Sequence, residues 1–440
     1  MVEGPAASRA RLLVELLRAE GWRGVAARLA DRAAAARRAR AFRPLPDGAR
    51  LPFEAPVLNV LPTRPLAELG GVQVQLLERL DSERRRRAVA LLHPTRTGFR
   101  LELQDGQARL ARDLPGSPDS AADWLRALQE ARSVTGARLL HVENLPGLPS
   151  ALLPALGEVA SRLVLSLHDL AAACLRVQLG GAPDPACALA RGGPPCAECP
   201  RGPATSCGSQ ALEARAAAAR LLARADALVL PSDFLRRRLA QVFPDLDAAR
   251  VELLPPARAL PRLPARAAGP LRHAAFVGPA HPHKGAAVLA ELAGSSSASG
   301  LRFSALGGGA PAWQVELRRR GVAVHGYYRD GSLPGRLRAL EADLVLLLSV
   351  WPESWGLTLD ESWAAGLPVL LFDGGAPAER VRSLGGGRVV PLAEGAAGIA
   401  RALAELGSHL PAVPPPNRRP ELSPENSARR LEALYGGLLS

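Results

Sequence analysis

The chain has 440 residues, of which 48% are hydrophobic and 22% are charged, a balance typical of globular proteins and unlike that of disordered ones. Its net charge of +13 suggests nucleic acid, but the arginines are spread along the chain and aromatic residues make up only 4%, which argues against a nucleic-acid partner. The sequence shows neither an apolar run of spanning length nor a secretory leader, so we expect a cytoplasmic protein of two domains.

Residues 1–50 are predicted to form a basic helical extension. Two short helices are expected, Leu12–Arg18 and Val25–Phe42, separated by the segment Glu20–Gly24. The simplest interpretation of the second helix, which is rich in alanine and arginine, is a solvated helix packed on the first domain. The alternative is a basic helix that lies on the inner face of an anionic membrane, which would make the protein peripheral to that membrane.

Residues 51–255 alternate between strand and helix patterns. Short β-rich runs occur at Val57–Leu61, Val89–His93, Leu139–Val142, Leu163–Leu167, Leu228–Leu230 and Val251–Leu254. Helical stretches such as Ala121–Ala131 and Ala211–Ala225 fall between several of them. Alternation of this kind builds a mostly parallel sheet with helices on both faces, so the first domain is predicted to be α/β.

Residues 256–270 are rich in proline, which predicts a linker to a second α/β domain at residues 271–412. Its strands are expected at Ala274–Val277, Leu301–Leu306, Val322–Gly326, Leu344–Leu348, Val369–Phe372 and Arg388–Val390. Residues 413–440 hold a Pro-rich stretch and a last helix, capped by Ser423 with Pro424 at its first position, which is expected to pack back on the first domain. In such parallel sheets ligands bind at the carboxyl ends of the strands.

The strongest functional signal is the stretch Pro352–Val369, which directly follows a buried strand. Glu353 therefore stands at the carboxyl end of that strand. The helix after it offers free N–H groups and a dipole that can bind a diphosphate. The residues expected at this helix start are Gly356, Leu357 and Thr358. Glu361 lies one to two turns inside the helix, where its carboxylate can accept hydrogen bonds from a ribose diol.

This stretch resembles the Glu-x7-Glu motif of family 4 (group 1) retaining glycosyltransferases, including the trailing Ala-x-Gly-x-Pro-Val. The resemblance covers about residues 56–410. It implies the GT-B fold, in which two Rossmann-like, doubly wound parallel-sheet domains face a central cleft. It also implies transfer of a hexosyl or deoxyhexosyl group from a nucleotide-diphosphate sugar, with no cofactor required. The implied acceptor is a glycan or a lipid-linked acceptor in cell-surface polysaccharide or glycan assembly.

The only lysine of the chain, Lys284, lies in the glycine-bounded loop Gly278–Gly285 after a predicted strand. A compact ammonium is suited to a phosphate as a point charge. The loop resembles the one that clamps the donor pyrophosphate in the family. Many members carry an arginine shortly after the first glycine, where this chain has Pro279–His281. Either His281 or His283 substitutes for that arginine, or Lys284 acts alone.

His168 follows the predicted strand Leu163–Leu167 and precedes Asp169, a pair that resembles one branch of the family. The resemblance implies that His168 contacts the donor sugar or helps to position the reacting groups. Two glycine turns also resemble donor-side loops of the family. One contains Gly71, after the first strand of the first domain, and the other contains Gly375, before a helix of the second domain.

An insert at residues 174–207 follows His168 and is rich in cysteine, as in the same branch of the family. Four of its cysteines have one Cys-x2-Cys pair among them: Cys187, Cys196, Cys199 and Cys207. They form either a structural zinc site or free thiols. A catalytic zinc is not expected, because four thiolates leave no open position for a substrate.

The expected reaction is a front-face displacement in which the leaving diphosphate takes the proton of the acceptor hydroxyl. Glu353 and His168 are the expected catalytic residues, and Lys284 stabilises the leaving group. Two alternatives use the same fold. One is a nucleotide-sugar epimerase, and the other is a catalytically decayed transferase that serves as a binding or scaffold protein.

Overall fold

The computed structural model describes residues 5–46, 48, 51, 53–64, 71–106, 108–173, 209–266, 269–295, 300–407, 409–414 and 423–440. These residues form two compact units, each built on one sheet. The six-stranded unit contains the described residues of 1–34 and 260–418. The nine-stranded unit contains those of 35–179, 184–259 and 419–440.

The sheet of the six-stranded unit is parallel throughout, with the strand order β12-β11-β10-β13-β14-β15. Its strands are β10 (His273–Val277), β11 (Arg302–Leu306), β12 (Ala323–Gly326), β13 (Leu344–Leu347), β14 (Val369–Phe372) and β15 (Gly387–Val390). The chain order reverses between β10 and β13. The carboxyl ends of these two neighbouring strands form a topological switch point. All six strands predicted for the second domain are present.

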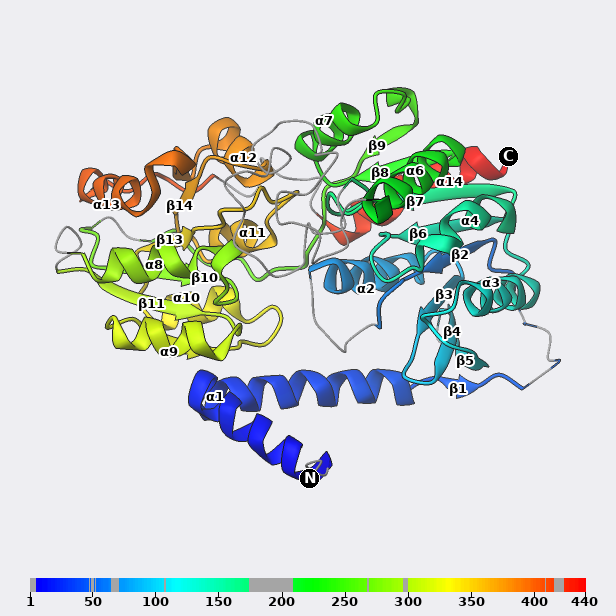
Figure 1. The fold of residues 1–440 in the computed structure, drawn as a ribbon, viewed down its shortest axis with the longest axis horizontal. Helices are drawn as coiled ribbons and strands as arrows, with labels where there is room; N and C mark the ends of the chain where they lie inside the picture. The colour runs from blue at the N-terminus through cyan, green and yellow to red at the C-terminus, as the bar shows by residue number, and fades with distance from the viewer. Residues whose placement is uncertain are drawn as a thin grey trace. The chain divides into compact units, whose positions relative to one another are not determined.

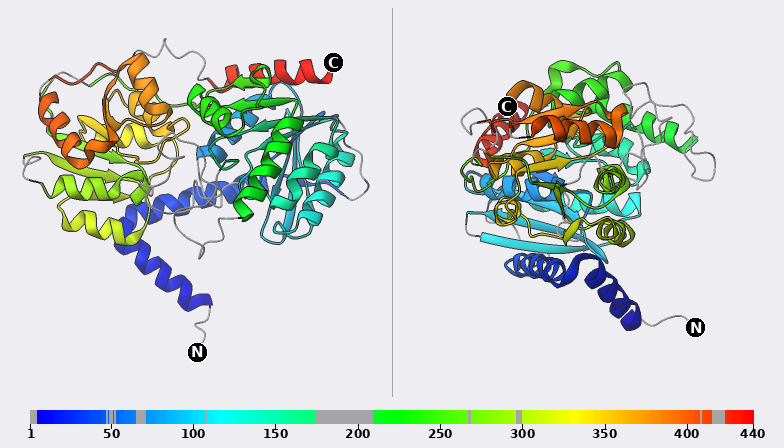
Figure 2. Two further views of the ribbon diagram at one scale, coloured as in Figure 1. Left: turned by 45° about the horizontal axis from the view of Figure 1, so that its top comes forward. Right: turned by 90° about the vertical axis from the view of Figure 1, so that its left-hand side faces the viewer.

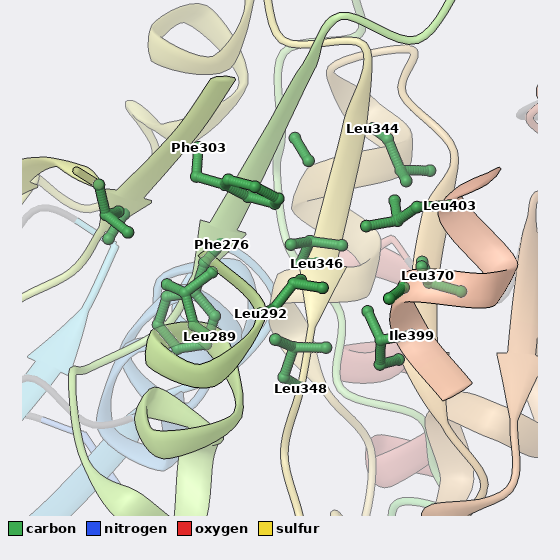
Figure 3. Close-up of a cluster of buried hydrophobic side chains, with 14 of the residues drawn as sticks. Phe276, Leu289, Leu292, Phe303, Leu344, Leu346, Leu348, Leu370, Ile399 and Leu403 are labelled. Atoms are coloured by element: carbon green, nitrogen blue, oxygen red, sulfur yellow. The ribbon is translucent and has the colours of Figure 1, made fainter. Parts of the chain in front are cut away.

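Helices cover both faces of this sheet: α8 (Ala286–Ala293), α9 (Pro311–Arg319), α10 (Leu333–Ala339), α11 (Leu357–Ala364), α12 (Ala376–Leu384) and α13 (Gly395–Leu406). Figure 3 shows one face, where Leu289 and Leu292 of α8 and Ile399 of α13 pack onto the strand residues Phe276 and Leu346. The other core contains residues of α10, α11 and α12. The central strands β10, β13 and β14 are thus buried on both faces, which explains why their sequences are almost wholly apolar without alternation. The edge strands β12 and β15 are partly exposed.

The nine-stranded sheet has the order β1-β5-β4-β3-β2-β6-β7-β8-β9. Its strands are β1 (Arg43–Pro44), β2 (Val57–Val60), β3 (Val89–Pro94), β4 (Gly98–Asp105), β5 (Ala108–Pro115), β6 (Leu139–Glu143), β7 (Arg162–Ser166), β8 (Ala227–Leu230) and β9 (Val251–Leu253). The six predicted strands are all present and run parallel. The antiparallel hairpin β4–β5 beyond β3 was not predicted.

The helices of this unit are α2 (Gly71–Glu83), α3 (Ala121–Thr135), α4 (Leu153–Val159), α6 (Ser209–Arg224), α7 (Asp233–Val242) and α14 (Pro424–Leu439). The last helix begins as its sequence indicates, because the Ser423 side chain accepts a hydrogen bond from Asn426 N at 3.0 Å. Its residues Leu431 and Tyr435 pack on Val57 and Leu139 of the sheet. Figure 1 shows α14 at the chain end.

The described residues of the proline-rich segment, 256–266 and 269–270, form no helix or strand, yet the segment is bonded on both sides of the boundary between the units. The two units divide between Ala259 and Leu260. On the side of the nine-stranded unit, the backbone N–H of Ala259 donates to Glu78 of α2 at 3.1 Å. On the other side, Leu263 N donates to the carbonyl oxygen of Ala364 at 2.8 Å, and Arg266 pairs with Asp343. The segment is therefore anchored within each unit by residues that belong to that unit.

Helix α1 (Pro5–Arg40) contains a break at Gly21, whose φ of 68° and ψ of 172° are not helical. Figure 2 shows the two helical segments that meet there. The break falls inside the segment Glu20–Gly24 that the sequence marks as an interruption. The second predicted helix, Val25–Phe42, was expected to pack on the first domain. The expectation holds for Ala39, whose carbonyl oxygen accepts from Arg100 of the nine-stranded unit at 3.3 Å. It is wrong for Arg28 and Asp31, which contact Tyr327 of the six-stranded unit.

Candidate functional site

Two of the predicted site residues, Lys284 and Glu353, are in direct contact. The ammonium of Lys284 donates to Oε1 of Glu353 at 2.7 Å, and both side chains are partly buried. Lys284 follows β10 and Glu353 follows β13, the neighbouring strands of the switch point. The topology therefore brings together two residues that are 69 positions apart in sequence.

The position of Lys284 is set by the turn Pro282–Lys284 and by the glycine after it. Gly285 has a φ of +90°, and a Cβ at this position would overlap the carbonyl oxygen of Leu348, the residue directly after β13. The turn is also hydrogen-bonded to the segment between β13 and Glu353, because Val350 N donates to the carbonyl oxygen of His283 at 3.1 Å. The lysine is thus held by the segment that leads to Glu353.

Glu353 is fixed by its backbone as well as by Lys284. It forms an isolated parallel bridge with Gly375, and Ala376 N donates to its carbonyl oxygen at 2.8 Å. Gly375 has a φ of +84°, and a Cβ there would overlap the backbone of Glu353. The glycine turn predicted at Gly375 is therefore required by the close approach of these two backbones.

Helix α11 begins beside the Glu353 carboxylate, at Leu357 and Thr358. Gly356 precedes it with a φ of +80° and has no side chain to cap the first N–H groups. A Cβ on Gly356 would lie 2.6 Å from Cγ of Pro377 and 3.3 Å from Oε2 of Glu353. Only glycine fits this position without displacement, and no side chain caps the first N–H groups of α11.

Glu361 lies in the second turn of α11 and is buried. Its neighbour Asp360, which the sequence did not mark, ties α11 to α12 through an ion pair with Arg380. The guanidinium of Arg380 lies 3.8 Å from the ring centroid of Trp355, and Trp355 Nε1 donates to Asp360 at 2.9 Å. This cluster fixes the segment between Glu353 and the helix start. Arg380 escaped prediction because its partner is 20 residues away.

The charges at the site follow from burial and from the ion pair. Burial alone would raise the pKa of Glu353, but the Lys284 ammonium and the Ser349 hydroxyl outweigh it and lower that pKa. Burial lowers the pKa of His281, and burial together with the nearby Lys284 ammonium lowers the pKa of His283 to about 4. Both shifts favour the neutral imidazole. Whether His281 or His283 substitutes for the missing arginine stays a prediction.

The loop of Lys284 is braced by a glycine loop after β11 that the sequence analysis overlooked. Ala280 N donates to the carbonyl oxygen of Gly308 at 2.7 Å, and Ala310 N donates to that of Ala280 at 3.2 Å. A Cβ on Gly307 would overlap the carbonyl oxygen of Gly278, which itself has a φ of +138°. Three consecutive glycines directly after a strand were the signal that could have revealed this contact.

Helix α1 packs against the same glycine loop. The Arg28 guanidinium pairs with the buried carboxylate of Glu20, with Nε 2.7 Å from Oε2, and lies over the ring of Tyr327 at 4.5 Å. A Cβ on Gly308 would overlap this guanidinium, so α1 contacts the loop that supports the Lys284 turn. Residues 20–28 are therefore part of the framework of the six-stranded unit.

His168 and Gly71 belong to the nine-stranded unit. His168 follows β7, and its Nδ1 accepts from the Gln75 amide at 2.9 Å, while its Nε2 lies 3.6 Å from Oε2 of Glu143. Gly71 is the first residue of α2, the helix that carries Gln75. His168 and Gln75 line a pocket with Glu143 and Arg79. Its residues gather where the chain order reverses between β2 and β6.

The charged residues of this pocket form a buried network that the sequence analysis missed. Arg79 pairs with Glu143 and with Glu83, and it donates to the hydroxyl of Tyr435 at 3.3 Å. Burial would raise the pKa of Glu143, but Arg79 and the nearby histidines lower it. Burial lowers the pKa of His141 to about 3. The network therefore holds an ionised carboxylate beside His168.

The cysteines predicted to bind zinc lie outside the described residues. In the part of the chain that is described, His, Cys, Asp and Glu form no cluster that could hold a metal ion. The choice between structural zinc and free thiols at residues 187–207 stays a prediction.

Residues 272–409 match the family model described as "Glycosyl transferases group 1". The match coincides with the six-stranded sheet and includes Lys284, Glu353 and Glu361. The match supports a glycosyltransferase. Its first and last residues, 272 and 409, lie one and three residues inside the second domain predicted at 271–412. No curated protein matches the chain.

Solved structures resemble the chain over most of its length. Sucrose-phosphate synthase from Thermosynechococcus elongatus is 15% identical with a TM-score of 0.57, covering 86% of this chain and 95% of its own. A glycosyltransferase from Rickettsia africae is 13% identical with a TM-score of 0.57, covering 88% and 99%. Anabaena HepE in complex with UDP-glucose is 13% identical with a TM-score of 0.53, covering 86% and 94%. These likenesses show the fold, which is GT-B.

Proposed function

We propose that the chain is a retaining glycosyltransferase that moves a sugar from a nucleotide-diphosphate sugar to an acceptor hydroxyl. The observation that carries the proposal is the contact between Lys284 and Glu353 at the carboxyl ends of β10 and β13, beside the open start of α11. A cation and a free helix start together form a diphosphate site. Glu353 adds a carboxylate at the place where the sugar attached to that diphosphate would lie.

Donor binding would separate the ion pair. The diphosphate competes with Glu353 for the Lys284 ammonium, and the N–H groups of Leu357 and Thr358 bind the remaining phosphate oxygens. Glu353 is then free to accept hydrogen bonds from sugar hydroxyls and to stabilise the positive charge that develops at the anomeric carbon. Glu361 accepts hydrogen bonds from the ribose hydroxyls.

In the proposed displacement, the acceptor oxygen bonds to the anomeric carbon on the face from which the diphosphate oxygen departs. The acceptor proton passes to that departing oxygen, so the step needs neither a metal nor a second carboxylate as nucleophile. His168 would contact the donor sugar, with its ring fixed by Gln75 and Glu143. Gly71 and Gly278 would let backbone approach the donor.

The comparisons support a nucleotide-sugar donor, because HepE is described in complex with UDP and with UDP-glucose. We therefore place UDP-hexoses first among the candidates, within the broader class of hexosyl and deoxyhexosyl donors. The proposed acceptor is a growing cell-surface polysaccharide or a lipid-linked glycan. One compared structure is a lipopolysaccharide outer core galactosyltransferase, 12% identical with a TM-score of 0.55.

A screen for thermal stabilisation and hydrolysis with nucleotide-diphosphate sugars tests this function. A ligand at about 100 times its Kd stabilises the native state by about 2.7 kcal/mol, which raises the Tm by several degrees. Glu361→Ala should abolish the response to the one effective donor, and Arg429→Ala on the exposed face of α14 should retain it. A folded wild-type protein that responds to no donor would contradict the proposal.

The scaffold alternative has one observation in its favour. Burial lowers the pKa of both histidines of the Lys284 loop, which favours their neutral forms at the place where many members of the resembled family carry an arginine. Donor binding without hydrolysis or transfer would favour a binding protein. Binding followed by release of free nucleoside diphosphate, with no acceptor glycosylated, would favour the epimerase alternative.

A further inference from the structure

Helix α1 carries a corner that is fixed to the six-stranded unit. At the break, the Arg318 side chain donates to the carbonyl oxygen of Arg18 at 3.1 Å and also to that of Ala19. Both carbonyls belong to the last turn before Gly21, where the helical pattern stops. Ala19 and Val25 on either side of the break are buried. The corner is thus held in one orientation, and its outward face is presented by a fixed framework.

The acidic residues next to the corner face the protein. Glu20 is buried and pairs with Arg28, and Asp31 accepts a hydrogen bond from the Tyr327 hydroxyl at 2.8 Å. Arg329 lies near the same carboxylate at 3.4 Å. Both negative charges of residues 19–31 are therefore neutralised on the inward side, and they do not offset the cations on the outward side.

The exposed side chains of α1 include an unusual share of apolar ones. Five of the seven exposed large hydrophobic side chains in the described part of the chain lie on this helix. They are Leu13 (46% exposed), Val14 (45%), Leu17 (41%), Trp22 (69%) and Leu29 (57%). Single exposed apolar residues are ordinary, but a concentration on one helix marks an interaction surface.

Arginines accompany these apolar residues. Arg18, Arg23 and Arg32 are exposed, and the Arg23 guanidinium lies 5.6 Å from the ring centroid of Trp22. Among the described side chains of residues 13–32, Glu15 is the one exposed acid. We name the set Leu13, Val14, Leu17, Arg18, Trp22, Arg23, Leu29 and Arg32 the α1 surface.

We propose that the α1 surface binds an anionic lipid bilayer, with Trp22 and the leucines at the boundary of headgroups and acyl chains and the arginines on the phosphates. An apolar face alone would also suit a second copy of the chain or another protein. The excess of exposed arginine favours anionic lipid, because basic residues near such a surface are attracted by its negative potential. In the described part of the chain, no helix is long and apolar enough to cross a membrane. A helix that presents both arginines and apolar residues to the outside is suited to the surface of a bilayer.

The α1 surface gives the proposed function a place to meet its acceptor. That link to a lipid-borne acceptor rests on the proposed transferase activity, whereas the lipid contact itself does not. Lipid binding and donor binding are therefore measured separately on every variant, so that the failure of one proposal is distinguishable from the failure of the other.

The test is co-sedimentation of the full-length protein with vesicles of phosphatidylcholine alone or mixed equally with phosphatidylglycerol. Wild type should pellet with the anionic vesicles, less so as salt is raised. Arg18→Glu with Arg23→Glu should weaken this binding by at least about tenfold, because each basic residue contributes measurably at an anionic surface. Trp22→Ser with Leu29→Ser should weaken binding to a comparable degree by removing buried apolar area.

Matched control variants come from exposed residues elsewhere. Leu392→Ser removes an apolar side chain that is 39% exposed, and Arg401→Glu with Arg429→Glu reverses two exposed arginines. Both controls should bind vesicles as wild type does. Equal losses in the controls would show unspecific attraction to an arginine-rich protein and overturn the proposal. A concentration-dependent dimer that Trp22→Ser with Leu29→Ser dissolves, without any vesicle binding, would assign the surface to a second copy.

Discussion

Lys284 and Glu353 form an ion pair of 2.7 Å between the loop after β10 and the segment after β13. The pair neutralises two groups that the proposed reaction needs for different tasks. A bound diphosphate would take the ammonium away from Glu353, because two phosphate groups carry more negative charge than one carboxylate. Donor binding and the release of Glu353 are thereby coupled, because Lys284 exchanges one partner for the other. Mutation of each residue alone can distinguish their roles.

Lys284→Gln should weaken the binding of a nucleoside diphosphate by about 10- to 100-fold, because a hydrogen bond to a charged group contributes about 1.5–3 kcal/mol. Lys284→Arg keeps the charge and should lose less. Isothermal titration calorimetry with the diphosphate of the effective donor measures both. Equal affinity of Lys284→Gln and wild type would exclude Lys284 from the diphosphate site.

Glu353→Gln should lower turnover without weakening the binding of the diphosphate, unlike Lys284→Gln. The change frees Lys284 from its ion pair, so the diphosphate should bind at least as tightly as in wild type. Turnover should fall by about 100-fold or more, because the charge that stabilises the developing positive centre is lost. Parallel measurement of Kd and kcat separates the two effects. A loss of affinity without a loss of turnover would assign Glu353 to the framework.

The sequence predicted twelve parallel strands because each is a short β-rich run, and the central ones are buried on both faces. It missed β1, β4 and β5. In β4 the polar residues Glu102 and Gln104 are buried as well as Leu101 and Leu103, so the strand has no continuous apolar run of the kind that marked the others. The Lys284–Glu353 site could be predicted because both residues follow strands that meet at a switch point. Buried charges such as Arg79 and Glu143 could not, because a charged residue is read as exposed until its distant partner is known.

Gly375→Ala should displace Glu353. The added Cβ would overlap the backbone of Glu353, and the φ of +84° is itself unfavourable for alanine. We expect a loss of about 1–3 kcal/mol in the free energy of unfolding, together with reduced turnover. The neighbouring Gly374→Ala is the control, because a Cβ there has no atom within 4 Å and the backbone has no positive φ. Equal behaviour of the two variants in urea unfolding would contradict this account of Glu353.

His141 should make the protein sensitive to acid. Burial lowers its pKa to about 3, below the value of about 6.5 in the unfolded chain, so the unfolded state binds more protons between these values. The stability that comes from neutral His141 is present above pH 6.5 and is lost as the pH falls toward 3, by up to about 1.4 kcal/mol per pH unit. His141→Gln should flatten this part of the stability curve, as measured by unfolding at a series of pH values. Parallel curves for the two proteins would rule out His141 as the source.

Arg28→Ala should weaken donor binding from a distance. The change leaves the buried Glu20 carboxylate without its guanidinium partner and removes the side chain that packs on Gly308, which bonds to the loop of Lys284. We expect a loss of about 1–3 kcal/mol in stability and a several-fold weaker affinity for the nucleoside diphosphate. Arg32→Ala, on the exposed side of the same helix, should change neither quantity. The double variant Glu20→Ala with Arg28→Ala should regain part of the stability, because no buried charge is then left unpaired. A stability loss without any change in donor affinity would confine residues 20–28 to a structural role.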